Sequence, residues 1–184
     1  MEFTNEQKLI ITLLTDIHAA LEIRDSVDPS FVQDAVSSGR TWALEWQYPG
    51  IFEGRAETPA QVLFVVSVLE MWERLERSYA ELNKESHANI AERAAPFGGK
   101  PVFPGFDGNG GDGDAYGTAN LLINQMGRWT SFQSHDLNSH MPMSDSYQRM
   151  LETLSELDKG HADYYFSQDE IVALLRSRIH PENR

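Results

Sequence analysis

The chain has 184 residues, of which 41% are hydrophobic and 23% charged, a composition typical of one globular domain with a sizeable core. It contains no cysteine, which excludes a disulfide framework, a thiolate zinc site, a cysteine-ligated iron–sulfur cluster and a cysteine nucleophile. Its 15 basic and 28 acidic residues give a formal net charge of −13, which disfavours nucleic acid and anionic membranes as partners.

Neither the start of the chain nor its apolar runs predict export or membrane insertion. Residues 1–8 are mostly polar and lack the basic and apolar regions of a secretory signal. The longest apolar run, residues 62–69 with Ser67 inside it, is far shorter than the ~20 residues that a membrane helix needs. We therefore expect a cytoplasmic protein that does not enter the membrane.

A first helix is predicted to start after Thr4. Thr4 and Gln7 have the spacing of a capping box, in which each side chain accepts a hydrogen bond from the backbone N–H of the other residue. Aliphatic residues then recur every three or four positions. They form one apolar stripe, which we expect to face the core: Leu9, Ile10, Leu13, Leu14, Ile17 and Leu21.

A second helix is predicted from Asp28 and Pro29, because an aspartate can cap a helix whose first residue is proline. Gly39 allows two interpretations. It ends this helix as a left-handed cap, or it lies inside the helix where another backbone comes close. The spacing of the apolar residues favours continuation through Trp42 and Trp46.

A third helix follows the break at residues 48–50. Thr58 and Gln61 form a second capping box, with Pro59 at the first helical position. Apolar residues at helical spacing follow, and we expect the helix to run beyond Ser86.

Residues 95–113 are rich in proline and glycine, so they predict neither a regular helix nor a central strand. We interpret them as a long crossing segment that ends in a flexible acidic loop. This segment is also the best candidate boundary within a single 1–184 domain, dividing it into an N-terminal helical part, 1–94, and a C-terminal helical part, 95–184.

Three helices are predicted after this segment. Asp114 can cap a helix over residues 115–129, which is followed by a polar loop over 134–143. A second helix is expected to start at Ser144 and to end near Gly160, and the last to start at a capping box. That box is formed by Ser167 and Glu170. No sustained two-residue alternation marks a strand, so we expect an all-α bundle of about six helices.

Several segments resemble, in order and spacing, the YfbU family of bacterial proteins. The similarity is carried by TNEQKLI at residues 4–10, FPGFD at 103–107, GRWT at 127–130 and PMSDSYQRML at 142–151. It is weakest between residues 23 and 57, and the glycine tract at 108–113 departs from the family pattern. The resemblance implies an all-helical fold with a helical-hairpin part and a larger helical part. It implies no reaction, cofactor or catalytic residue.

The glycine tract, residues 108–113, matches G-x-G-x-x-G, the pattern of a dinucleotide-binding turn. Prolines precede it where a buried strand is required, and the neighbouring aspartates Asp107, Asp112 and Asp114 would repel a pyrophosphate. The tract also fails the register of an EF-hand calcium loop. We therefore expect no bound cofactor here.

His135, Asp136 and His140 lie in the polar loop and combine the imidazole and carboxylate groups that bind transition metals. There is no third histidine at a recognised spacing and no H-E-x-x-H motif, so solvated loop side chains are the simpler interpretation. A metal-assisted hydrolase that uses these three residues is our alternative hypothesis for function.

The leading hypothesis is a non-enzymatic protein-interaction or regulatory protein, in which a helical face binds another protein or a second copy of this chain as a homo-oligomer. Aromatic residues at helical spacing are typically core anchors, although any that stay exposed would line a binding groove. Four residues are candidates for such a contact or for binding an anion, with structural roles as the alternative: Arg128, Trp129, Tyr147 and Arg149.

Overall fold

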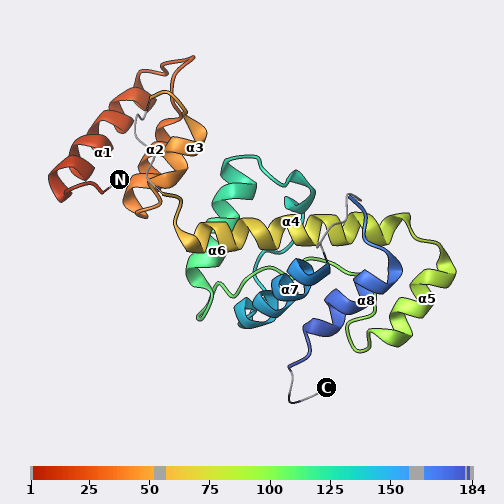
Figure 1. The fold of residues 1–184 in the computed structure, drawn as a ribbon. Coiled ribbons are helices and arrows are strands. Elements are labelled where there is room, and N and C mark those ends of the chain that lie inside the picture. The colour runs from red at the N-terminus through yellow and green to blue at the C-terminus, as the bar shows by residue number, and fades with distance from the viewer. Residues whose placement is uncertain (1, 52–56, 158–163, 181, 183–184) are drawn as a thin grey trace. The chain divides into compact units, whose positions relative to one another are not determined.

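The computed structural model describes residues 2–51, 57–157, 164–180 and 182. Over these residues the chain forms eight α-helices and no strand, with one isolated bridge between Phe106 and Asn138. The predicted all-α fold is confirmed, with eight helices where about six were expected. The chain divides into two compact units, Met1–Ala60 and Gln61–Arg184 (Figure 1).

The division at residues 60 and 61 differs from the boundary that the glycine- and proline-rich segment suggested. That segment lies inside the second unit, where Phe103 is buried and its ring centroid is 6.1 Å from that of Trp72. It is therefore packed into a core instead of linking two cores. The behaviour of residues 1–184 as a single domain stays a prediction.

The first unit contains α1 (Asn5–Ala20), α2 (Pro29–Ser37) and α3 (Trp42–Gln47). Both hydrogen bonds of the predicted capping box at Thr4 are present. The Asp28 carboxylate caps α2 by accepting from the backbone N–H groups of Ser30 and Phe31, at 2.9 and 3.2 Å. Local sequence signals therefore predicted both helix starts correctly.

The predicted continuation of α2 through Gly39 is wrong. Gly39 adopts φ +75°, a left-handed conformation that a glycine tolerates and that ends a helix. The chain turns there, and α3 begins as a separate helix at Trp42.

The second unit is organised along α4 (Ala60–Glu81). The prediction that this helix runs beyond Ser86 is wrong, because a new helix, α5 (Lys84–Arg93), begins after a short break. The Asn83 side chain caps α5 by accepting from the backbone N–H of Ser86 at 2.9 Å. This asparagine cap divides the predicted long helix into α4 and α5.

The remaining helices follow the predicted order with shifted bounds. The capping box at Ser167 and Glu170 is confirmed. The first of these helices starts at Gly113 instead of after Asp114, and the predicted helix end at Gly160 lies outside the described residues. The elements are α6 (Gly113–Asn120), a π-helical turn (Leu121–Gln125), a 3-10 turn (Thr130–Phe132), α7 (Ser144–Leu157) and α8 (Gln168–Ser177).

An aromatic cluster forms the centre of the second unit. Tyr147 of α7 is fully buried, with its ring centroid 5.3 Å from Phe106 and 6.3 Å from Trp72 of α4. Its hydroxyl donates a 2.6 Å hydrogen bond to the Gly105 carbonyl. Burial raises the pKa of Tyr147 well above its ordinary value, so the hydroxyl stays protonated as a donor.

The crossing at residues 103–107 packs against the polar loop. Phe106 donates to the Leu137 carbonyl at 2.9 Å and accepts from the Ser139 N–H at 3.1 Å. Gly105 has φ +84°, and a Cβ added there would collide with the Leu137 carbonyl. Only a glycine lets these two backbones approach so closely.

Most of the glycine tract is exposed, but its Asp112 is buried. This carboxylate accepts hydrogen bonds from the Met143 N–H at 2.6 Å and the Ser144 hydroxyl at 2.6 Å. It also accepts from the Asp107 N–H at 3.4 Å. Asp112 thus ties the tract to the first residues of α7, and it faces inward where a pyrophosphate site would need an open loop.

We predict that Asp112→Ala destabilises the second unit by about 3 kcal/mol, because two short hydrogen bonds to a charged acceptor, each worth about 1.5–3 kcal/mol, are lost in the interior. Urea denaturation measures the change. Asp114→Ala, at an exposed position two residues away, is the matched control and should change the free energy of unfolding by less than about 0.5 kcal/mol. Equal effects of the two substitutions would contradict the role given to Asp112.

Candidate functional site

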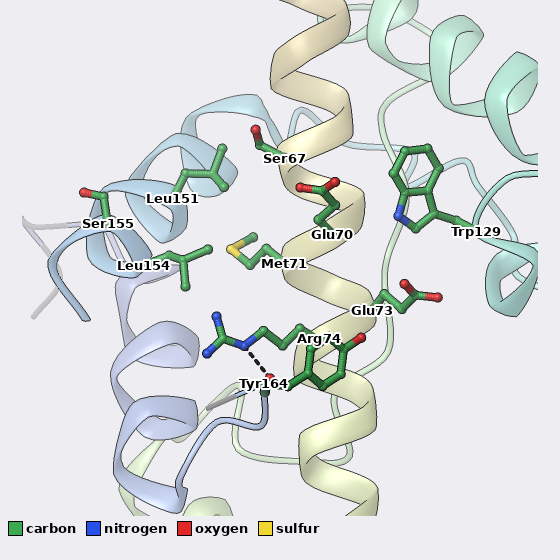
Figure 2. A pocket seen from close by; sticks show the side chains of 10 residues that line it. All are labelled: Ser67, Glu70, Met71, Glu73, Arg74, Trp129, Leu151, Leu154, Ser155 and Tyr164. Atoms are coloured by element: carbon green, nitrogen blue, oxygen red, sulfur yellow. Dashed lines mark hydrogen bonds between the residues drawn. The ribbon is translucent and has the colours of Figure 1, made fainter. Parts of the chain in front are cut away.

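A cleft of about 880 Å³ crosses the exposed side of α4 in the second unit (Figure 2). This volume lies within the range of roughly 300–1,000 Å³ that is typical of ligand pockets. Its lining comes from α4 and α7, and from Trp129 and Tyr164, which lie before and after α7 in the chain. The lining residues are Ser67, Glu70, Met71, Glu73, Arg74, Trp129, Leu151, Leu154, Ser155 and Tyr164.

The two sides of the cleft differ in chemistry. Figure 2 shows Leu151 and Leu154 of α7 on one side, where they make an apolar wall beside Met71. Glu70 of α4 and the indole of Trp129 line the cleft away from these leucines. Such a surface can bind a ligand by packing and by charge. Among the lining residues that the structure describes, no nucleophile is paired with a base.

Trp129 is held in an unusual backbone conformation, with φ +45° and ψ 52°. A left-handed conformation costs a bulky residue about 1–3 kcal/mol and therefore persists only where its surroundings impose it. The same side chain also lines a second hollow of about 350 Å³ together with Arg128. Trp129 and Arg128, two of the four predicted contact residues, are thus placed at one surface.

The charged groups around the cleft are held by specific partners. Glu73 accepts from Arg77 at 2.9 Å and from the Ser131 hydroxyl at 3.1 Å. Arg74 donates to the Tyr164 carbonyl at 2.6 Å, and its guanidinium lies 3.8 Å from the centre of the Phe166 ring. These interactions fix the floor of the cleft in place.

The other two predicted contact residues have structural positions. Tyr147 is in the core described above and has no exposed surface to offer a partner. Arg149 donates to the carbonyls of Ser177 and Arg178 at 3.0 and 2.8 Å. A cation at these carbonyls stabilises the C-terminal end of α8, where the helix dipole is negative. The structural alternative for Arg149 thus takes the form of a helix cap.

The three candidate metal ligands are not grouped together, because His140 lies near Asp136 whereas His135 lies near Glu76. The His135 Nδ1 atom is 4.0 Å from a Glu76 carboxylate oxygen, whereas His140 is exposed, 3.9 Å from Asp136, and hydrogen bonds to Asn109. Within the part of the chain that the structure describes, no three His, Asp or Glu side chains are grouped so that they could hold a metal ion. These residues give no support to the metal-assisted hydrolase.

The apolar face of α1 is exposed, so the prediction that it faces the core is wrong. We define this face by its six aliphatic residues, each between 54% and 67% exposed: Leu9, Ile10, Leu13, Leu14, Ile17 and Leu21.

The opposite side of α1 is turned inward, and it contains Thr15, which is only 8% exposed. Thr12 and Thr15 donate their hydroxyl hydrogens to carbonyls of the previous turn, at 3.0 Å from Thr12 to Lys8 and 2.9 Å from Thr15 to Ile11. The helix therefore buries hydroxyl-bearing residues and exposes aliphatic ones, the reverse of a normal surface helix.

The fold and these surfaces define an all-α protein with an exposed apolar helix face and a ligand-sized cleft. A family model, the YfbU domain, matches residues 1–177, so the chain belongs to the YfbU family and the resemblance seen in the sequence is confirmed. Across the described residues no helix has both the length and the apolar character needed to cross a membrane. The cytoplasmic location stays a prediction.

Glu76, the neighbour of His135, has a pKa that burial shifts and that can be tested. Desolvation by burial raises the pKa of Glu76, although its carboxylate accepts from the Phe103 N–H at 2.6 Å. A raised pKa means that the folded state binds the proton more tightly than the unfolded state. The free energy of unfolding therefore falls as the pH rises from the ordinary glutamate pKa through the raised one.

We predict that Glu76→Gln removes this part of the pH dependence, because glutamine keeps an acceptor for Phe103 and cannot ionise. The difference in unfolding free energy between the variant and the unmodified protein should shift in favour of the variant as the pH rises through this interval. Urea titrations at a series of pH values measure it. Glu152→Gln, at an exposed site on α7, is the control. A difference for Glu76→Gln that does not change with pH would contradict the prediction.

Proposed function

We propose that this chain functions by binding protein, and that the apolar face of α1 is the contact surface. The observation that supports the proposal is the reversed polarity of α1, whose aliphatic residues are exposed while Thr15 is buried. A helix with this pattern does not bury its large aliphatic side chains within its own unit.

The free energy available at this face is large enough to drive association. Full burial of a leucine or isoleucine side chain is worth about 1.5–3 kcal/mol. Covering the exposed parts of the six residues is therefore worth on the order of 5–10 kcal/mol before the costs of association are subtracted. Exposed apolar patches of this kind are typical of interaction sites.

The charge of the surroundings favours a protein over a lipid surface. Helices that lie on membranes have lysine and arginine on their polar face, because anionic lipids attract them. Here Glu6 and Asp16 are exposed on α1, and the whole chain carries a net charge of −13. An apolar centre with charged residues around it matches the usual anatomy of a protein–protein interface.

A photo-cross-linking amino acid placed at Leu14 tests the proposal in cells that produce the protein. We expect a covalent adduct with a polypeptide, identified by mass spectrometry, because the partner would lie against this side chain. The same amino acid at Gln47, an exposed position on α3, should give no such adduct. Adding Ile17→Glu to the Leu14 variant should abolish the adduct, since a charge would be buried at the interface.

Two results would contradict the proposal. One is the absence of a polypeptide adduct at Leu14. The other is equal adduct formation at Leu14 and Gln47, which would indicate non-specific labelling.

A further inference from the structure

We infer that the protein bound by the apolar face of α1 is a second copy of this chain, with the two α1 helices packed antiparallel about a two-fold axis near Leu13 and Leu14. This inference rests on the binding role proposed for that face. It adds the identity of the partner and the direction in which the partner runs.

The order of residues within α1 is self-complementary. The segment 10–17 has the sequence IITLLTDI, which is the same in both directions apart from one pair, Ile11 and Asp16. In an antiparallel pair with its axis between residues 13 and 14, Ile10 of one copy is level with Ile17 of the other. In an isologous interface every contact occurs twice with the copies exchanged, so this order brings like aliphatic residues level with each other in both halves.

Within the segment 10–17, the aliphatic and the polar residues of the symmetric pairs lie on opposite sides of the helix. At 100° per residue, the six aliphatic residues cover an arc of roughly 140° and extend for about 18 Å along the helix. Thr12 and Thr15, the symmetric polar pair, lie on the other side, where both are at least partly buried. The mismatched Ile11 also lies on the inner side, so it does not enter the proposed interface.

The area of the face fits a reversible dimer. At about 25 cal/mol per Å², a side chain worth about 1.5–3 kcal/mol has about 60–120 Å² of apolar surface. With the observed exposures, the six residues contribute roughly 200–400 Å² per copy and 400–800 Å² per pair. A stable interface buries about 1,200–2,000 Å² in total, of which about 56–65% is apolar, so this face alone gives an apolar area at or below the lower end of that range. Association should therefore be weak and depend on concentration.

The first unit has a structural need for such a partner. Among the residues of this unit that the structure describes, the buried hydrophobic ones are few for a unit of 60 residues, a size at which a hydrophobic core is marginal. They are Phe31, Ala35, Val36, Trp42, Ala43 and Leu44. A second α1 laid against the first would extend this core by the whole apolar face of each copy.

The mass in solution, measured by light scattering over a range of protein concentrations, tests self-association. We expect the mass to rise from 20.8 kDa towards twice that value with increasing concentration. Two chains of net charge −13 repel each other, so added salt should strengthen the dimer. Leu13→Glu should give only the monomer, whereas Leu63→Glu, at a 51% exposed leucine of the second unit, should leave the dimer unchanged. Circular dichroism confirms that each variant is folded.

Single cysteines test the direction of pairing, and the absence of native cysteine makes the experiment clean. About the proposed axis, the two copies of residue 13 are offset by one residue, about 1.5 Å, and the two copies of residue 21 by fifteen residues, about 22 Å. A disulfide requires Cα atoms within about 7 Å. Leu13→Cys should therefore form a disulfide-linked dimer on oxidation, and Leu21→Cys should not.

The possible results separate this inference from the proposed function. A protein that stays monomeric at all concentrations, while Leu14 cross-links to a different polypeptide, overturns the second copy as partner and leaves the binding role intact. A monomer without any adduct at Leu14 overturns both. A dimer that Leu13→Glu does not disrupt, or one that the Leu13→Cys and Leu21→Cys variants link equally well, overturns the antiparallel pairing.

Discussion

The hydrogen bond from the Tyr147 hydroxyl to the Gly105 carbonyl is the interaction on which the second unit depends. It joins α7 to the crossing that carries Phe103 and Phe106, and the same ring packs against Trp72 of α4. Because α7 is fixed at this point, Leu151 and Leu154 project from its following turns into the cleft. The position of the cleft wall is thus a consequence of a buried polar contact in the core.

The parts of the fold that depend on neighbouring residues could be predicted from the sequence. The capping boxes at Thr4 and Ser167 involve residues three apart, so their hydrogen bonds follow from local geometry alone. A helix end at Gly39 was one of two interpretations and not the favoured one, whereas the break at Asn83 was not predicted. At these positions a backbone turn or a side-chain cap ends the helix, and the spacing of apolar residues does not reveal it.

The candidate surfaces were harder to predict, because they depend on which segments meet in space. The cleft combines Glu70 of α4 with Trp129, and no spacing rule connects residues so far apart in the chain. Asp112 illustrates the same limit: it lies in a glycine-rich tract that indicated a flexible acidic loop, and nothing local indicates that its hydrogen-bond partners are 31 and 32 residues away. Periodicity identified the apolar face of α1 correctly, but it could not show whether that face is buried or exposed.

The reversed polarity of α1 has a simple energetic basis. Thr12 and Thr15 satisfy their hydroxyl groups with carbonyls of their own helix, so turning them inward leaves no unpaired polar group. The two threonines therefore face inward with their hydroxyl groups satisfied, whereas six large aliphatic residues remain on the outer side, exposed to water.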